Sequence, residues 1–290
     1  MEVLSVLNKK GGVGKTTVAT NLAQGLAIVG QRVLVIDNDG QRNLTSSLGI
    51  SVKDCPVTLA DIMKSPSGPK MESVAAKSIY ESFISGLYCV VGSGELDVIN
   101  PRKTVLSEFL CSKVVQNLKI DFVIIDNAPS MSAKTVSAIN ASKYFLLPVQ
   151  LENFSIAGLA EMFEVLTKVY DINPENIFIL RNMYRKIGHY DNNSRALEIA
   201  YPDNIMETII PHDLVFDKLV CRDKTAFFSQ SKCKGTLQFQ RLFCELFGFD
   251  EQQMFEKFKL ALEKYRSEVA KENLKKAKIK NLSLKEAANA

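Results

Sequence analysis

The sequence lacks the residue clusters that hold zinc or iron–sulfur centres. Its six cysteines are Cys55, Cys89, Cys111, Cys221, Cys233 and Cys244. None of them forms a C-x-x-C pair, and the chain has only two histidines. Both kinds of centre need paired cysteines or a mixed Cys/His cluster, so neither is expected. Scattered thiols are typical of a reducing cytosol.

Long apolar runs are also missing. None approaches the ~20 residues of a membrane-spanning helix, and the chain enters an apolar run directly after Met1-Glu2, so no signal or transit peptide is expected. With 46% hydrophobic and 23% charged residues, the composition is typical of a folded soluble protein. The net charge of +4 permits nucleic-acid binding without requiring it.

The most informative stretch is a glycine-rich block near the start. Residues 3–7 are apolar and β-prone, and residues 18–27 have apolar side chains at helical spacing. Between them lies K-G-G-V-G-K-T-T, which departs from the pattern G-x-x-x-x-G-K-[ST] because Lys9 occupies the first glycine position. Strand, glycine loop and helix together predict a phosphate-binding loop, and a glycine-rich turn is the alternative.

The residue types of this block suit an anion. Its glycines let backbone N–H groups surround a phosphate, and the following helix N-terminus adds partial positive charge. Lys15 can neutralise the β- and γ-phosphates, and the Thr16 hydroxyl can hold Mg²⁺. The predicted nucleotide-binding residues of the loop are Lys10, Gly11, Gly12, Val13, Gly14, Lys15, Thr16 and Thr17.

Two acidic strand ends accompany the loop. Residues 31–36 predict a buried strand that brings Asp37 and Asp39 to its carboxyl end, where ligands bind in open α/β sheets. These acids suit Mg²⁺ or the attacking water, and a helix N-cap or solvated turn is the alternative. Residues 121–126 end in Asp126, which is typical of a strand that supports Mg²⁺ beside Thr16. The predicted metal ligands are Thr16, Asp39 and Asp126.

The block K-G-G-V-G-K-T-T resembles the variant phosphate loop of the ParA/MinD family of ATPases. The resemblance implies that Lys10 is the signature lysine, which reaches across a dimer to the partner subunit's nucleotide. It also implies that Asp39, the second acid of the family's D-x-D-P-Q, is required for hydrolysis. Lys10, Lys15 and Asp39 are therefore the predicted catalytic residues. Gly40 stands where the family usually has proline, which loosens the turn.

Further blocks extend the resemblance from Glu2 to about Phe247. Residues 127–130 depart slightly from the family's C/T-P-P-S but keep its proline, and residues 148–159 resemble its PVQ-x-E block. Residues 96–101 resemble the family's strand that leads to an "IP" dipeptide. The resemblance also implies adenine contacts from Asn182, Pro211 and Asp213, for which ordinary loop residues are the alternative.

Strands alternating with helices predict an α/β fold, a mainly parallel twisted β-sheet flanked by helices. Expected strands also include residues 87–91, 143–149, 176–181 and 205–210; expected helices are 58–63, 71–77, 102–118, 155–170, with Ser155 as its cap, and 192–200. The predicted organisation is a P-loop ATPase domain over 1–248 and an amphipathic, basic helical extension over 249–290.

Basic residues gather late in the chain. They are Lys218, Arg222, Lys224, Lys232 and Lys234. The resemblance implies that this region contacts DNA, although His212 and Val215 occupy the expected arginine places; a solvated helix face is the alternative. The basic tail has few large apolar residues, so DNA phosphates, a partner protein or solvation suit it better than a membrane.

The best interpretation is a ParA-like partition ATPase with ATP and Mg²⁺ as cofactors. The resemblance implies a weak ATPase that dimerises on ATP, binds DNA non-specifically on the nucleoid in the cytoplasm, and is stimulated by a centromere-binding partner protein. The preference for adenine also rests on the resemblance. A MinD-like division-site regulator would need a lipid-binding tail. An iron–sulfur carrier or nitrogenase-reductase relative would need paired or interfacial cysteines. Positioning of a protein cargo would use the same cycle as partition of a plasmid or chromosome.

Overall fold

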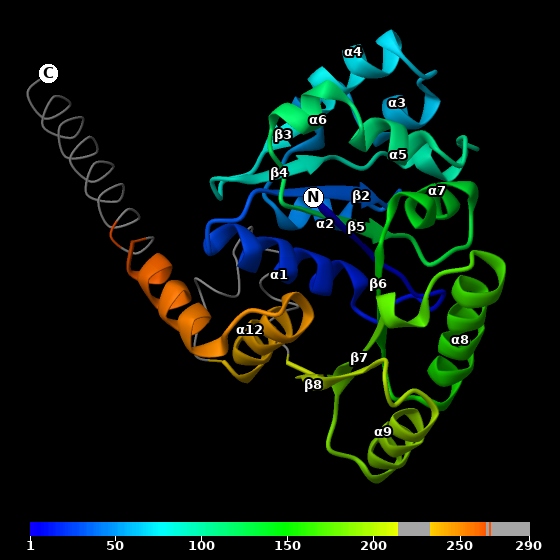
Figure 1. The fold of residues 1–290 in the computed structure, drawn as a ribbon, viewed down its shortest axis with the longest axis vertical. Helices are drawn as coiled ribbons and strands as arrows, with labels where there is room; N and C mark the ends of the chain where they lie inside the picture. The colour runs from blue at the N-terminus through cyan, green and yellow to red at the C-terminus, as the bar shows by residue number, and fades with distance from the viewer. Residues whose placement is uncertain (214–232, 265–266, 268–290) are drawn as a thin grey trace, which may run out of the picture.

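The computed structural model describes residues 1–213, 233–264 and 267. Within these residues, eight strands form one sheet in the order β3-β4-β2-β5-β1-β6-β7-β8 (Figure 1). Every neighbouring pair is parallel except β3–β4, which confirms the predicted α/β fold with a mainly parallel sheet. The strands are β1 Glu2–Val6, β2 Val33–Asn38, β3 Ile79–Glu81, β4 Leu87–Val90, β5 Phe122–Asn127, β6 Tyr144–Val149, β7 Ile177–Tyr184 and β8 Ile205–Pro211.

Helices cover both faces of the sheet. They are α1 Lys15–Ile28, α2 Asn43–Ser47, α3 Leu59–Lys64, α4 Pro69–Ser78, α5 Val105–Leu110, α6 Lys113–Asn117, α7 Ala133–Ala141, α8 Asn153–Glu164, α9 Gly188–Ala200 and α12 Lys234–Phe247. Short helical turns are η1 Val52–Asp54, η2 Gly94–Asp97, η3 Val165–Val169 and η4 Pro174–Asn176, and residues 251–264 form a further helix. None of the described helices is both long and apolar enough to cross a membrane.

Alternating strand side chains divide the core between the two faces. On one face, Leu4 and Val35 pack with α1 and α12, which lie next to each other in Figure 1. On the other face, Val3 and Leu34 pack with α3 to α7, and β6 and β7 pack with α8 and α9. Central parallel strands are apolar on both sides for this reason, and β2 is buried along its whole length. The covered sheet leaves its strand tips free to carry the site.

The helix over 251–264 lies at the start of the amphipathic, basic extension predicted over 249–290. Its Met254 and Phe258 are buried in the same cluster as α1. Phe243 of α12 stacks on Phe249 with ring centres 5.1 Å apart and meets Phe258 edge-on at 5.8 Å. The start of the predicted extension therefore contributes to the core, and the division at residue 248 stays a prediction.

Several element predictions were wrong in detail. The helix expected over 102–118 is two helices, α5 and α6, because the Ser112 hydroxyl accepts the Val115 N–H and starts a new helix. Residues 94–97 form the η2 turn, so the strand expected over 96–101 is absent from this described part. The strand of this region that pairs with β2 is β4, as expected for residues 87–91. Helix α8 starts at Asn153, so Glu152 occupies the N-cap position predicted for Ser155. Strand β3 was not predicted.

Candidate nucleotide-binding site

The glycine block forms the turn between β1 and α1. Gly12 has φ +75° and Gly14, at the N-cap of α1, has φ +86°, conformations that side chains other than glycine rarely adopt. A Cβ added at Gly11 or Gly12 would meet nothing within 4 Å, so open space lies beside this backbone. At Gly14 it would lie 2.4 Å from Nδ2 of Asn182. The loop is open towards a ligand and closed towards β7.

Side chains from neighbouring strand tips hold this loop from behind. Asn182 of β7 donates to the Val13 carbonyl at 2.8 Å, and Gln150 donates to the Gly12 carbonyl at 3.3 Å. Asn8 accepts the Lys10 N–H at 2.8 Å and donates to the Pro148 carbonyl. These contacts fix the loop before any ligand binds, which lowers the ordering cost of phosphate binding.

Lys15 points into the interior of the site. Its side chain is buried, and Nζ donates to the Lys10 carbonyl at 3.2 Å. Burial lowers the pKa of Lys15, while the nearby Asp126 and Asp39 carboxylates oppose that shift. A poorly solvated ammonium inside a glycine loop is well suited to bind a phosphate group.

Thr16 and Asp126 meet at the base of the loop. The Thr16 hydroxyl donates to Oδ2 of Asp126 at 2.6 Å. Burial, followed by the charge of Asp37, raises the pKa of Asp126 to about 8. Its Oδ1 is buried and has no hydrogen-bond partner among the described residues. An orphaned carboxylate oxygen beside a hydroxyl fits a magnesium ion, which prefers oxygen ligands.

The two acids at the end of β2 have different environments. Asp37 is fully buried within the strand and accepts hydrogen bonds from both the N–H and the hydroxyl of Thr45. Burial raises the pKa of Asp37 to about 6. Asp39 lies beyond the strand, is half-buried, and accepts the Gln41 N–H at 2.9 Å. Of the two acids, Asp39 is therefore the one accessible to a ligand.

The two lysines that open the loop face α8. Lys10 is 32% exposed and pairs with Glu152 at 2.7 Å, and Lys9 pairs with Glu161. Lys10 and Lys15, both predicted catalytic residues, thus differ in exposure. Lys15 is inside the site, and Lys10 is at its surface.

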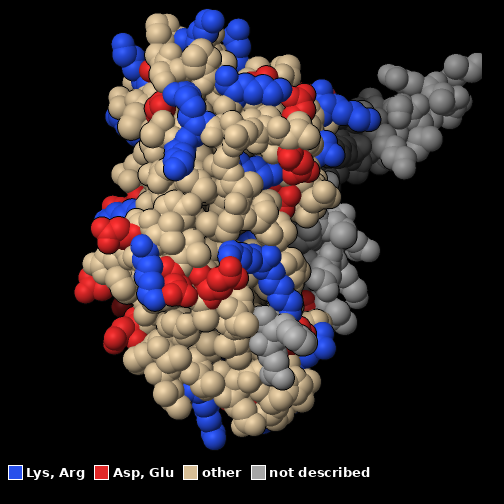
Figure 2. Space-filling model, turned by 90° about the vertical axis from the view of Figure 1, so that its right-hand side faces the viewer, with Lys and Arg blue, Asp and Glu red and all other residues tan. Residues whose placement is uncertain are grey.

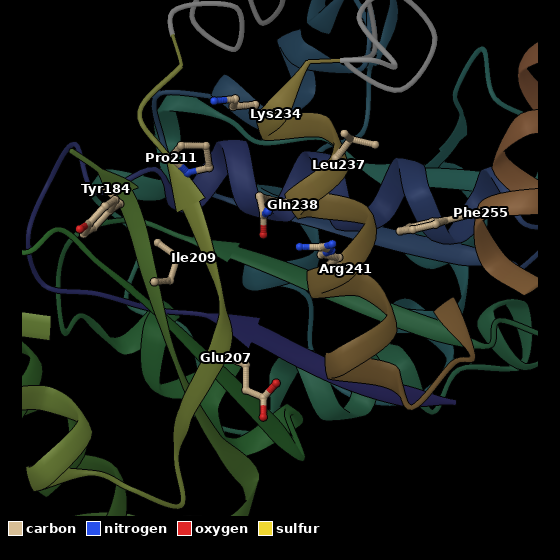
Figure 3. A pocket seen from close by; sticks show the side chains of 9 residues that line it. All are labelled: Tyr184, Glu207, Ile209, Pro211, Lys234, Leu237, Gln238, Arg241 and Phe255. Carbon is tan, nitrogen blue, oxygen red and sulfur yellow. The ribbon is translucent and has the colours of Figure 1, made fainter. Parts of the chain in front are cut away.

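The residues predicted to contact adenine lie at the tips of β7 and β8. Asn182 is buried against the loop, Tyr184 pairs with Pro211 in register, and Asp213 is half-buried just after β8. Pro211 also lines a groove of about 650 Å³ between β8 and α12. Figure 3 shows Pro211 and Lys234 at one end of this groove and Glu207 at the other. Adenine contact by Asn182, Pro211 and Asp213 stays a prediction.

Most of the predicted DNA contacts, Lys218, Arg222, Lys224 and Lys232, lie outside the described residues. Lys234 is described, and it is exposed at the start of α12. On the face drawn in Figure 2, basic and acidic side chains are interspersed rather than gathered into a basic patch. That face of the described chain therefore adds no basic surface to the predicted cluster.

Gly92, Asn8 and Gln150 contribute to the site but were not predicted from the sequence. The Gly92 N–H donates to the Thr45 hydroxyl at 3.1 Å, and a Cβ at Gly92 would lie 2.9 Å from the Asp39 carbonyl oxygen. The G-S-G that follows β4 was the available signal for Gly92. Gln150 belongs to the PVQ-x-E block, which was the available signal for it. Asn8 acts through backbone contacts that leave no pattern in the sequence.

Known proteins are similar to this chain in sequence and in fold. The AAA_31 family model, described as an AAA domain, matches residues 1–179. The sporulation initiation inhibitor protein Soj of Bacillus subtilis is 30% identical over 240 residues, covering 81% of this chain and 93% of Soj. The chain belongs to the ParA/MinD family of ATPases. Chromosome partitioning protein ParA of Caulobacter vibrioides is 27% identical over 83% of this chain and 92% of its own length.

Solved structures of other proteins have the same fold. An ATP complex of a McdA variant from Cyanothece has a TM-score of 0.70 at 19% identity, covering 86% of this chain and 97% of McdA. Cell division ATPase MinD of Pyrococcus furiosus has a TM-score of 0.66 at 24% identity, covering 84% of this chain and 98% of MinD. At these identities the likeness shows the fold alone.

Proposed function

We propose that this chain is a ParA-like ATPase that dimerises on binding ATP, binds DNA non-specifically and uses hydrolysis to partition a plasmid or chromosome. The observation that carries the proposal is the different burial of two lysines in one loop. Lys15 is buried beside the acids, whereas Lys10 lies at the surface, where a second subunit could receive it. The similarity to a protein named chromosome partitioning protein ParA supports partition as the function.

Each group of the loop has a role in binding and hydrolysis. Backbone N–H groups and Lys15 bind the phosphates. Thr16, Asp126 and Asp39 would hold Mg²⁺, which supplies neutralising charge when bound. Asp39 orients the attacking water because its carboxylate is accessible while that of Asp37 is not. Asn182, Pro211 and Asp213 would contact the adenine.

Lys10 couples hydrolysis to dimerisation. In the single chain its ammonium pairs with Glu152, and an exposed pair of this kind is worth only about 0–1 kcal/mol. Exchange of that carboxylate for the partner subunit's phosphates is therefore inexpensive. The isolated chain then hydrolyses ATP weakly, and a centromere-binding partner protein would raise the rate while the complex is on the nucleoid.

DNA contact is assigned to Lys218, Arg222, Lys224, Lys232 and Lys234. The helix over 251–264 bears on the MinD-like alternative, because it buries Met254 and Phe258 in the core. Those apolar side chains are not available to enter a lipid surface. A membrane is therefore not among the proposed partners.

DNA binding measured against salt concentration tests the proposal. Binding is expected with ATP and not with ADP, and its affinity should fall steeply with salt as counterions are released. Lys10→Ala should abolish binding, whereas Asp39→Ala should prolong it because hydrolysis stops. Lys9→Ala is the matched control, since Lys9 also pairs with an acid of α8 and should bind DNA like the wild type.

The same assay separates the alternatives. An ATP-bound chain that ignores DNA but sediments with anionic vesicles would overturn partition in favour of a MinD-like role. Binding to neither would turn the search to a protein cargo. Equal losses from Lys9→Ala and Lys10→Ala would contradict the special role of Lys10.

A further inference from the structure

Two positions at which this chain departs from the family pattern, Gly40 and Asn127, are linked through Lys134 of α7. Asn127 at the end of β5 accepts a 2.8 Å hydrogen bond from Nδ2 of Asn38, and the same Nδ2 contacts the Lys134 carbonyl at 3.2 Å. Asn38 immediately precedes Asp39. The backbone of Lys134 therefore lies beside the strand tip that carries the proposed catalytic acid.

The side chain of Lys134 is buried, which is uncommon for an ammonium group. It is only 5% exposed, and Nζ donates to Oδ1 of Asp97 at 2.9 Å. Asp97, in η2, is itself 58% exposed. A buried charge requires a partner, and removing the partner is costly. Lys134 therefore holds the Asp97 carboxylate in one place at the surface of the site.

That carboxylate lies directly against Gly40. A Cβ added at Gly40 would lie 2.5 Å from Oδ2 and 2.6 Å from Oδ1 of Asp97, closer than real Cβ atoms come. The atoms that collide are the end of an exposed side chain, so a Cβ at position 40 would displace the Asp97 carboxylate from its place beside Lys134. The space that another residue would need at position 40 is filled by that carboxylate.

We propose that Lys134 and Asp97 are positioning residues for Asp39. They follow β5 and β4, the two strands that flank β2 in the sheet, so the ion pair crosses the tip of β2. The Asp39–Gln41 turn, whose carboxylate is held by the Gln41 N–H, is thereby confined on the Gly40 side. This inference rests on the proposed ATPase function and names what aligns its water-orienting acid.

Steady-state ATP hydrolysis by single and double variants tests the pair. Asp97→Ala and Lys134→Met should each lower kcat by about 10- to 100-fold, the scale of a small misplacement of a catalytic group, with KM changed less than about twofold. Gly40→Ala should also lower kcat. In Gly40→Ala/Asp97→Ala the collision is gone, so the double variant should match Asp97→Ala rather than show the product of both losses.

The neighbouring pair of Glu95 and Lys64 provides the matched control. Glu95 lies in the same η2 turn as Asp97, but the side chains of Glu95 and Lys64 are both exposed. Glu95→Ala should keep kcat within about twofold of the wild type, because exposed pairs contribute little. Urea unfolding of each variant checks that losses of kcat are not losses of folded protein.

The outcomes separate the two proposals. A wild-type chain with no ATPase activity overturns the proposed function. A wild-type chain that hydrolyses ATP while Asp97→Ala and Lys134→Met match it overturns the positioning role alone. Multiplying losses in the double variant would show that Gly40 and Asp97 act independently, which also overturns it.

Discussion

Thr16 and Asp126 are joined by a 2.6 Å hydrogen bond that leaves one oxygen of the carboxylate without a partner in the described part of the chain. The hydroxyl and the carboxylate come from residues far apart in the sequence, one in α1 and one at the end of β5. Their contact places two oxygen atoms next to a buried lysine. The arrangement is costly on its own, because a buried carboxylate is poorly solvated.

Asn in place of Asp126 is expected to change how stability depends on pH. Burial raises the pKa of Asp126 from 3.8 to about 8, so the folded chain keeps a proton that the unfolded chain releases. The unfolding free energy contributed by this group is therefore present below about pH 4 and falls as the pH rises towards 8.

The pH effect can be measured by urea unfolding between about pH 6 and pH 8, without nucleotide or metal. In Asp126→Asn the unfolding free energy should fall less with rising pH than in the wild type. At about pH 8 the variant should therefore be the more stable protein. Thr16→Ala keeps the carboxyl group and should retain the fall. An unchanged slope in Asp126→Asn would contradict the raised pKa.

Alanine at two glycines of the loop should have different effects: one variant should lose ATP binding and the other should lose stability. Gly11→Ala meets open space, so its unfolding midpoint should stay near the wild-type value while its added methyl group intrudes on the phosphate cradle and weakens ATP binding. Gly14→Ala combines φ +86° with a 2.4 Å contact to Asn182. It should lose about 1–3 kcal/mol of stability. Urea unfolding and titration with a fluorescent ATP analogue distinguish the two.

Alanine at Gly92 is expected to disturb Asp39 from the other side. Its Cβ would lie 2.9 Å from the Asp39 carbonyl and 3.0 Å from Cγ of Asp37. Overpacking of this kind costs about 1–3 kcal/mol, and ATP hydrolysis should fall with it. Gly94→Ala is the control, because a Cβ there meets nothing within 4 Å. Similar unfolding midpoints for the two variants would argue against the close approach.

The phosphate loop, the strands and their acidic tips were predictable because each is a local pattern. A glycine-rich segment between a strand and a helix predicts a phosphate loop from its own residues, and Asp126 ends an apolar run that predicts a strand. The role of Lys134 could not be recognised in this way, because it comes from contacts across β4, β2 and β5. The G-S-G after β4 indicates a turn but not that Gly92 approaches Asp37 and Asp39. The break between α5 and α6 was missed because the apolar spacing continues through it. The new helix starts at Ser112, whose hydroxyl accepts one hydrogen bond from the Val115 N–H.

Arg181 is expected to be the main support of the edge strand that carries Pro211. Its side chain is buried, and it donates to the Met206 carbonyl at 2.7 Å and the Glu207 carbonyl at 3.2 Å, where the register of β8 shifts. It also pairs with Glu198 of α9. From α12, Glu245 accepts the N–H groups of Glu207 and Thr208. The irregular part of β8 is thus held at its carbonyls by Arg181 and at its N–H groups by Glu245.

Arg181→Met removes the guanidinium and with it the hydrogen bonds to the Met206 and Glu207 carbonyls. A loss of about 1–3 kcal/mol in unfolding free energy is expected, the usual cost of leaving a buried polar group without its partner. Arg195→Met on the exposed side of α9 should cost no more than about 0.5 kcal/mol. If Pro211 contacts the adenine, Arg181→Met should also weaken ATP binding among the molecules that remain folded. Equal unfolding midpoints for the two variants would show that β8 keeps its shape without Arg181.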